Sequence, residues 1–196
     1  MDRETAYAIV KEFVKGESLI KHMLAVEAAM RAYAVKYGED PDFWGLAGLL
    51  HDFDWEIHPN LMGHPLEGAP LLRERGVPEE IVRSILSHGM APGLPPRETT
   101  MDKALSAVDE LTGLITACVL VRPSRSLYDL APKSVRSKWK DKAFAAAINR
   151  VEIEEATKDL GVDLNEHIAT VIAAMRTIAP ELGLEGTLPP AGPAAS

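Results

Sequence analysis

The sequence predicts an all-α protein. Apolar residues recur at intervals of three and four through most of the chain, and no segment shows the alternating pattern of a strand. Capping residues, glycines and prolines bound each of these apolar patterns. Together they predict a single helical domain over residues 1–185, with about seven to nine helices. Residues 186–196 are rich in Pro, Ala and Gly, so we expect a disordered tail there.

Composition and charge argue against nucleic acid polymers and membranes as partners of this protein. The chain has 196 residues and a net charge of −8, which disfavours binding to a nucleic acid polymer. No apolar run approaches the roughly 20 residues that a membrane span needs, and the first residues lack the basic start and apolar stretch of a signal peptide. We therefore expect a cytoplasmic protein that makes no membrane contact. Its oligomeric state stays open, and an oligomer is compatible with the sequence.

Caps and stops set the helix boundaries in the first part of the chain. Gly16 ends the first apolar pattern, and Ser18 caps the second, longer one. Asp40 caps a third helix whose first residue is Pro41, a position where proline needs no amide hydrogen. The three predicted helices cover residues 2–15, 18–37 and 41–52.

Prolines and glycines punctuate the middle of the chain. Residues 53–65 contain two prolines and a glycine and are expected to form a loop. A short helix ended by Gly76 and another opened by Pro78 follow, and a rigid loop at 91–96 precedes a long helix. These three helices are expected to cover residues 66–75, 78–88 and 99–119.

Charge changes after the long helix. Residues 122–142 hold seven basic residues against two acidic ones. A solvated connector of short helices is one interpretation, and a rim that attracts an anionic substrate, with Arg122 and Lys133 as contacts, is the other. Two further helices follow, separated by the stop Gly161 and the cap Asp163. They are expected to cover residues 141–160 and 163–179.

A chemical signal ends the third helix. Its apolar run, residues 44–50, should be buried, yet His51 and Asp52 follow at once. Burying an imidazole beside a carboxylate is unfavourable unless hydrogen bonds, a counter-charge or a metal ion compensate. Five of the six histidines lie between residues 22 and 88, and an aspartate borders the apolar stripe of the long helix. These residues are His22, His51, His58, His64, His88 and Asp109.

Over about residues 18–120 this pattern resembles the HD-domain superfamily of metal-dependent hydrolases, including its HDIG-type members. The resemblance implies an HD-like helical bundle with a metal centre. It assigns as ligands a helical His, the His-Asp doublet, two further His residues and a helical Asp. In this chain they are His22, His51, Asp52, His64, His88 and Asp109. Nitrogen and carboxylate ligands together suit a divalent transition ion such as Fe, Mn, Zn, Ni or Co.

The number of ions depends on Asp52. Its two oxygens could bridge a pair of ions some 3.5–4 Å apart, and in binuclear members of the superfamily two additional histidines hold the second ion. His64 and His88 match those two positions in order. We therefore expect one or two ions, with a preference for two.

The residues after the doublet depart from the better-known motif, which continues with Ile-Gly and a lysine. Here Phe53-Asp54-Trp55-Glu56 follows, so the role of the lysine is not carried over. Asp54 and Glu56 join Asp52 as catalytic candidates, as proton donors or as partners of a ligating His, although both could be solvated loop charges. His58 is a candidate substrate contact or an exposed loop residue.

The resemblance implies a metal-dependent phosphohydrolase that directs activated water at a small phosphorylated metabolite or nucleotide. Two alternatives remain at this stage. One is a di-iron oxygenase on the same fold, which would consume oxygen rather than release phosphate. The other is a non-catalytic ligand-binding module, although the presence of all six ligand residues argues against a decayed site.

Overall fold

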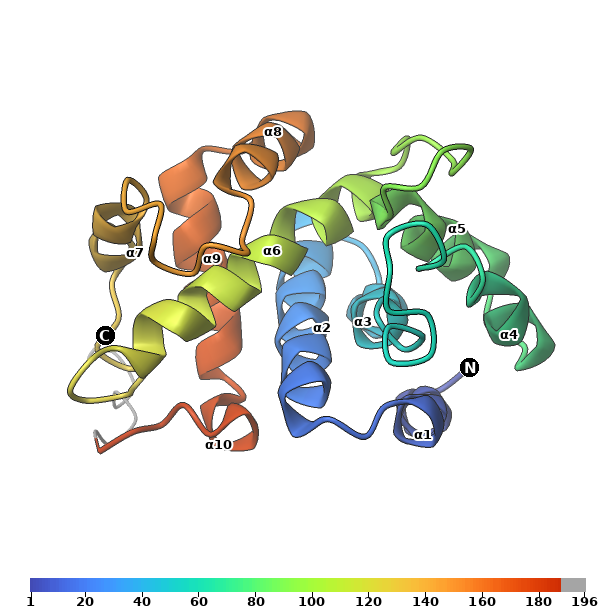
Figure 1. Ribbon diagram of the computed structural model, residues 1–196, viewed down its shortest axis with the longest axis horizontal. Coiled ribbons are helices and arrows are strands. Elements are labelled where there is room, and N and C mark those ends of the chain that lie inside the picture. The colour runs from blue at the N-terminus through green and yellow to red at the C-terminus, as the bar shows by residue number, and fades with distance from the viewer. Residues whose placement is uncertain (188–196) are drawn as a thin grey trace.

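In the computed structural model, which describes residues 1–187, all regular secondary structure is α-helical (Figure 1). This confirms the predicted fold class. The helices are α1 (Arg3–Phe13), α2 (Glu17–Tyr37), α3 (Pro41–Leu50), α4 (Ala69–Glu74), α5 (Glu79–His88), α6 (Thr100–Leu120), α7 (Pro132–Lys138), α8 (Arg150–Leu160), α9 (Leu164–Arg176) and α10 (Ala179–Leu182). The expected disordered tail lies outside the described residues from position 188 onward. None of the described helices combines the length and apolarity that a membrane crossing requires.

The number and bounds of the helices need correction in the second half of the chain. Within residues 1–187 there are ten helices rather than seven to nine, because α7 and α10 are short additional ones. The helix expected over residues 141–160 begins only at Arg150. Asn149 caps it by accepting hydrogen bonds from the amides of Val151 and Glu152. The guanidinium of Arg150 donates to the carbonyls of Ala145 and Ile148, each at 2.9 Å, and so holds the preceding turns outside the helix.

The long helix α6 runs across the molecule (Figure 1). It packs against α2, α3 and α5 from the first half of the chain and against α7, α8 and α9 from the second half, and α2 and α9 also pack against each other. A completely buried stripe that includes Leu105, Val108, Leu111 and Ile115 forms its contribution to the core. Because α6 touches helices from both halves of the chain, side chains on it can meet residues that are far apart in the sequence.

Helices α2 and α3 approach each other closely because a glycine lies between them. A Cβ atom on Gly48 of α3 would lie 2.9 Å from the backbone nitrogen of Glu27 on α2. Real side chains essentially never approach so closely, so only glycine permits this spacing. The close packing aligns the two helices that carry His22 and His51.

His167 on α9 is completely buried and joins three helices. Its Nε2 donates to the carbonyl oxygen of Ala107 at 2.8 Å, and its Nδ1 accepts from the hydroxyl of Tyr33 at 2.5 Å. Burial lowers the pKa of His167 to about 4 and outweighs the hydrogen bond to Ala107, which raises it. The imidazole is therefore neutral in the folded protein at pH 7.

This shift predicts a loss of stability in mild acid. Between about pH 6.5 and pH 4 the unfolded chain binds a proton at this position that the folded chain refuses, so the free energy of unfolding falls as the pH falls. The effect should approach about 3 kcal/mol near pH 4. Urea unfolding at pH 7 and pH 4.5 should show a smaller pH-dependent loss in His167→Gln than in wild type. A matching change in His58→Gln, the half-buried control, would argue against this assignment.

Candidate metal centre

Six side chains from separate parts of the chain converge beside α6. His22 lies in the second turn of α2, and His51 and Asp52 follow the last residue of α3. His64 comes from the turns between α3 and α4, His88 is the last residue of α5, and Asp109 lies in the middle of α6. These are the six residues that the sequence predicted as metal ligands, and the structure brings all of them together.

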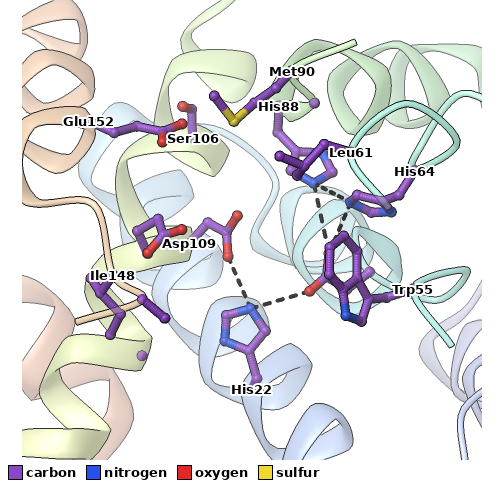
Figure 2. A pocket seen from close by; sticks show the side chains of 15 residues that line it. His22, Trp55, Leu61, His64, His88, Met90, Ser106, Asp109, Ile148 and Glu152 are labelled. Atoms are coloured by element: carbon purple, nitrogen blue, oxygen red, sulfur yellow. Dashed lines mark hydrogen bonds and ion pairs between the residues drawn. The ribbon is translucent and has the colours of Figure 1, made fainter. Parts of the chain in front are cut away.

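The first group of ligand atoms surrounds the Nε2 atom of His51. That atom lies 3.2 Å from Nε2 of His22, 3.4 Å from Oδ2 of Asp52 and 3.4 Å from Oδ1 of Asp109. Nε2 of His22 lies 3.0 Å from the same Asp109 oxygen (Figure 2). His22, His51 and Asp52 form one of two three-residue groups in the described chain whose atoms are spaced for a metal ion.

The second group contains Asp52, His64 and His88. Nε2 of His64 lies 3.2 Å from Oδ1 of Asp52 and 3.1 Å from Nε2 of His88. Nε2 of His88 lies 3.8 Å from the same carboxylate oxygen. Asp52 thus directs Oδ2 toward the first group and Oδ1 toward the second, which is the arrangement of a bridging carboxylate.

The hydrogen bonds of the other ring nitrogens test whether these histidines suit a cation. Nδ1 of His51 lies 2.8 Å from the carbonyl oxygen of Gly48, and Nδ1 of His88 donates to the carbonyl of Ile85. Because a carbonyl oxygen can only accept, each Nδ1 carries a hydrogen and the Nε2 of the neutral ring keeps a lone pair. Nδ1 of His64 likewise donates to Asp54 at 2.7 Å.

His22 completes the same pattern. The hydroxyl of Thr112 donates to the carbonyl of Asp109 at 2.8 Å, so it can accept a hydrogen bond from Nδ1 of His22, 3.2 Å away. In their neutral forms the four rings would therefore direct four Nε2 lone pairs at each other in two close pairs. Lone pairs at 3.1–3.2 Å repel unless a cation or proton lies between them. With two carboxylates beside them, this donor set fits divalent transition ions.

The charges of the centre are strongly coupled. Burial alone would raise the pKa of Asp52, but the positive charge of His51 and hydrogen bonds from His51, His64 and His88 hold it well below its usual range. The pKa of Asp109 is lowered in the same way, against burial, by His51 and His22. Burial opposes protonation of His64, yet hydrogen bonds to Asp52 and Asp54 raise its pKa to about 9. Both carboxylates therefore carry charge at neutral pH, and protons or metal ions must balance it.

Asp54, a predicted catalytic candidate, lies behind the ring of His64 rather than in front of it. It is completely buried, and its Oδ1 accepts the Nδ1 hydrogen bond of His64 while Nε2 faces Asp52. A Cβ atom on Gly68 would lie 2.3 Å from Oδ2 of Asp54, so a glycine is needed to admit the carboxylate. Carboxylates in this position orient a ligating histidine and strengthen its donor nitrogen.

The geometry predicts that Asp54→Asn weakens one ion selectively. The amide can still accept the His64 hydrogen bond but lacks the charge that supports the imidazole. We expect the affinity for the ion held by Asp52, His64 and His88 to fall about 10- to 100-fold, with the other ion unaffected. Metal content after dialysis against graded chelator measures this. Glu56→Gln is the control, and equal losses in both variants would contradict the orienting role.

The ligands open onto a pocket of about 330 Å³, called here the metal pocket. Trp55 stands over one wall, with its ring edge-on to His64 at a centroid distance of 5.1 Å. Ser106 and Glu152 line it together with apolar residues (Figure 2). Glu110 is also part of the lining. Burial and the charges of Asp109 and Glu152 raise the pKa of Glu110 to about 7. The lining of the metal pocket, all of it within the described residues, contains no lysine or arginine.

The other predicted site residues lie outside this lining. Glu56 accepts hydrogen bonds from the amides of Lys15 and Gly16, each at 2.8 Å, so both its oxygens are bound to the segment between α1 and α2. His58 pairs with Glu67, at 2.9 Å. Arg122 pairs with Asp129 at 2.7 Å beyond the end of α6, and Lys133 belongs to α7. Their neighbours are therefore structural partners rather than the metal ligands.

Several residues that line the metal pocket were not predicted from the sequence. Ser106 lies three residues before Asp109, and Gly113 lies four after it, so helical spacing could have placed both on the ligand face of α6. Trp55 and Glu152 had no such signal. Glu152 enters the pocket because α8 packs against α6, and Trp55 enters it because its ring packs against His64.

Comparison with known proteins identifies the class. Residues 19–113 match the protein-family model described as "HD domain". This segment, which carries all six ligands, is therefore an HD domain, and the family consists in general of metal-dependent hydrolases. Ribonuclease Y of Desulfotalea psychrophila (strain LSv54 / DSM 12343) is 30% identical over 99 residues, an alignment that covers 50% of this chain but only 18% of that relative. No solved structure matches the chain.

Proposed function

We propose that this protein is a metal-dependent phosphohydrolase that cleaves the phosphate ester of a small metabolite, with two divalent ions held by the six ligands. The proposal rests on one observation about Asp52. One of its carboxylate oxygens faces the group of His22 and His51, and the other faces the group of His64 and His88. A site for two ions that opens onto a pocket suits chemistry better than structural support.

In this proposal each part of the centre has a distinct task. When divalent ions are bound, they lower the pKa of coordinated water and withdraw charge from the phosphoryl oxygens. Hydrolysis forms a bond from the oxygen of water to phosphorus and breaks the ester bond, and the leaving oxygen takes up a proton. Gly48, Ile85, Thr112 and Asp54 keep the four imidazoles oriented through their Nδ1 atoms. Trp55 and Ile148 help to exclude water from the pocket.

A small substrate is favoured over a polymer. The relative from Desulfotalea psychrophila is named a ribonuclease, and 18% of its length aligns with this chain. RNA binding depends mainly on contacts from lysine and arginine to successive phosphates. Here the net charge is −8, and the lining of the metal pocket carries neither residue type. A pocket of about 330 Å³ suits a metabolite.

The test uses the full chain, stripped of metal by a chelator and reloaded separately with Mn, Fe, Co, Ni or Zn. Phosphate release from a panel of phosphate monoesters should require a metal ion and should be lost in Asp52→Asn. Oxygen consumption by the iron-loaded protein without phosphate release would replace the proposal with the oxygenase alternative. Binding of the panel without turnover under any metal would instead support a non-catalytic module.

A further inference from the structure

A second pocket of about 430 Å³ adjoins the metal pocket and is called here the outer pocket. Its lining includes His22 and Gly113, which also line the metal pocket, so the two cavities meet at these residues. Beyond this junction the outer pocket runs between the first turns of α2 and the second half of α6. The chain after α10 closes it. The additional lining residues are Ser18, Lys21, Thr116, Leu120 and 182–184.

Gly113 keeps the junction open. It lies on α6 between Asp109 and Thr116, which share one face of the helix. A Cβ atom there would contact only Ile148, at 3.4 Å, so close packing is not what requires a glycine at this position. A longer side chain would stand between the two pockets. From Asp109 to Thr116 the helix rises by about 10 Å, a distance that an elongated substrate could span.

The outer pocket provides a positive charge that the metal pocket lacks. Lys21 is half-buried, and its ammonium makes no ion pair or hydrogen bond with any side chain or carbonyl in residues 1–187. Its Nζ lies 3.3 Å from the position that a Cβ atom on Gly183 would occupy, which places the ammonium at the end of the pocket. Arg122, by contrast, is already paired with Asp129. A partly buried ammonium without a counter-charge is suited to bind an anionic group.

We propose that the outer pocket is a second substrate subsite, in which Lys21 binds an anionic group at the far end of an elongated phosphate ester. The phosphate would lie at the metal centre, the organic part would cross Gly113 beside the apolar side chains of Leu120 and Leu184, and a carboxylate or second phosphate would reach Lys21. The phosphate half of this assignment rests on the proposed function. The anionic specificity of the outer pocket rests on the two pockets and Lys21 alone.

Binding of two matched phosphonates tests the subsite without turnover, because their carbon–phosphorus bond resists hydrolysis by a phosphatase. The probes are 6-phosphonohexanoate, which ends in a carboxylate, and hexylphosphonate, which ends in a methyl group. Calorimetric titration of the manganese-loaded protein at low salt gives both affinities. Lys21→Met removes the charge and retains the stem, and Lys36→Met is the control on an exposed position of the same helix. Gly113→Leu closes the junction.

We expect wild type to bind the carboxylated probe at least about fivefold more tightly than hexylphosphonate, because its carboxylate would form a partly buried ion pair with Lys21. Lys21→Met should bring the ratio close to one, and Lys36→Met should preserve it. Gly113→Leu should weaken both probes. Equal affinities in wild type, a ratio that survives Lys21→Met, or no binding of either probe would overturn the subsite. An intact ratio without any metal-dependent phosphate release would overturn the hydrolase proposal alone.

Discussion

Asp52→Ala is expected to abolish phosphate release and to reduce bound metal from about two ions per chain to less than one. Both effects follow from the position of Asp52, which lies 3.4 Å from His51 through one oxygen and 3.2 Å from His64 through the other. Removing it takes one negatively charged ligand from each group, and four neutral imidazoles with Asp109 alone would hold two dications poorly. We expect the rate to fall at least about a thousandfold.

Metal content by elemental analysis and the initial rate of phosphate release measure this outcome. Far-UV circular dichroism should show an unchanged helical fold at low temperature, because Asp52 lies after the end of α3 and is not part of a helix. Asp129→Asn, which removes an exposed carboxylate paired with Arg122, is the matched control and should retain both metal and rate. Full metal content together with full turnover in Asp52→Ala would show that the doublet is not the centre.

His64→Ala and His88→Ala are each expected to lower the metal content from about two ions to about one. Their Nε2 atoms lie 3.1 Å apart in the second group, and neither belongs to the group formed by His22, His51 and Asp52. The ion in that first group should therefore persist. The rate should still fall by orders of magnitude, because the lost ion would stabilise charge that develops in the transition state.

The reciprocal variant, His22→Ala, distinguishes the two groups. It should release the other ion and leave the one held by His64 and His88, so that the two classes of variant bind equal numbers of ions at different sites. Substitution with cobalt, whose absorption spectrum depends on coordination, can show which site remains. The binuclear assignment is wrong if wild type binds a single ion at saturating metal and both His64→Ala and His88→Ala match it in metal content and rate.

Much of the fold could be predicted because helices depend on local signals. Asp40 and Pro41 start α3, Thr99 caps α6 with a reciprocal capping box, and Gly38 adopts the left-handed conformation that ends α2. These signals involve residues within one helical turn of each other. The start of α8 was predicted wrongly, because the bonds that hold residues 145–148 outside the helix come from the side chain of Arg150, which no periodicity reveals.

The six candidate ligands could also be named from the sequence. The placement of His51 and Asp52 after a run too apolar to be exposed indicated a site, and the resemblance to the HD-domain superfamily, in residue types and order, implied the full set. Only the tertiary structure decided what surrounds them. In the structure Asp54 lies behind His64, and Glu56 accepts hydrogen bonds from the amides of Lys15 and Gly16. Glu152 lines the metal pocket. Chain-local rules carry information over a few residues, whereas the direction of a side chain outside a helix depends on contacts with residues tens of positions away. The close approach of α2 and α3 at Gly48, and the packing of α6 against both halves of the chain, provide those contacts here.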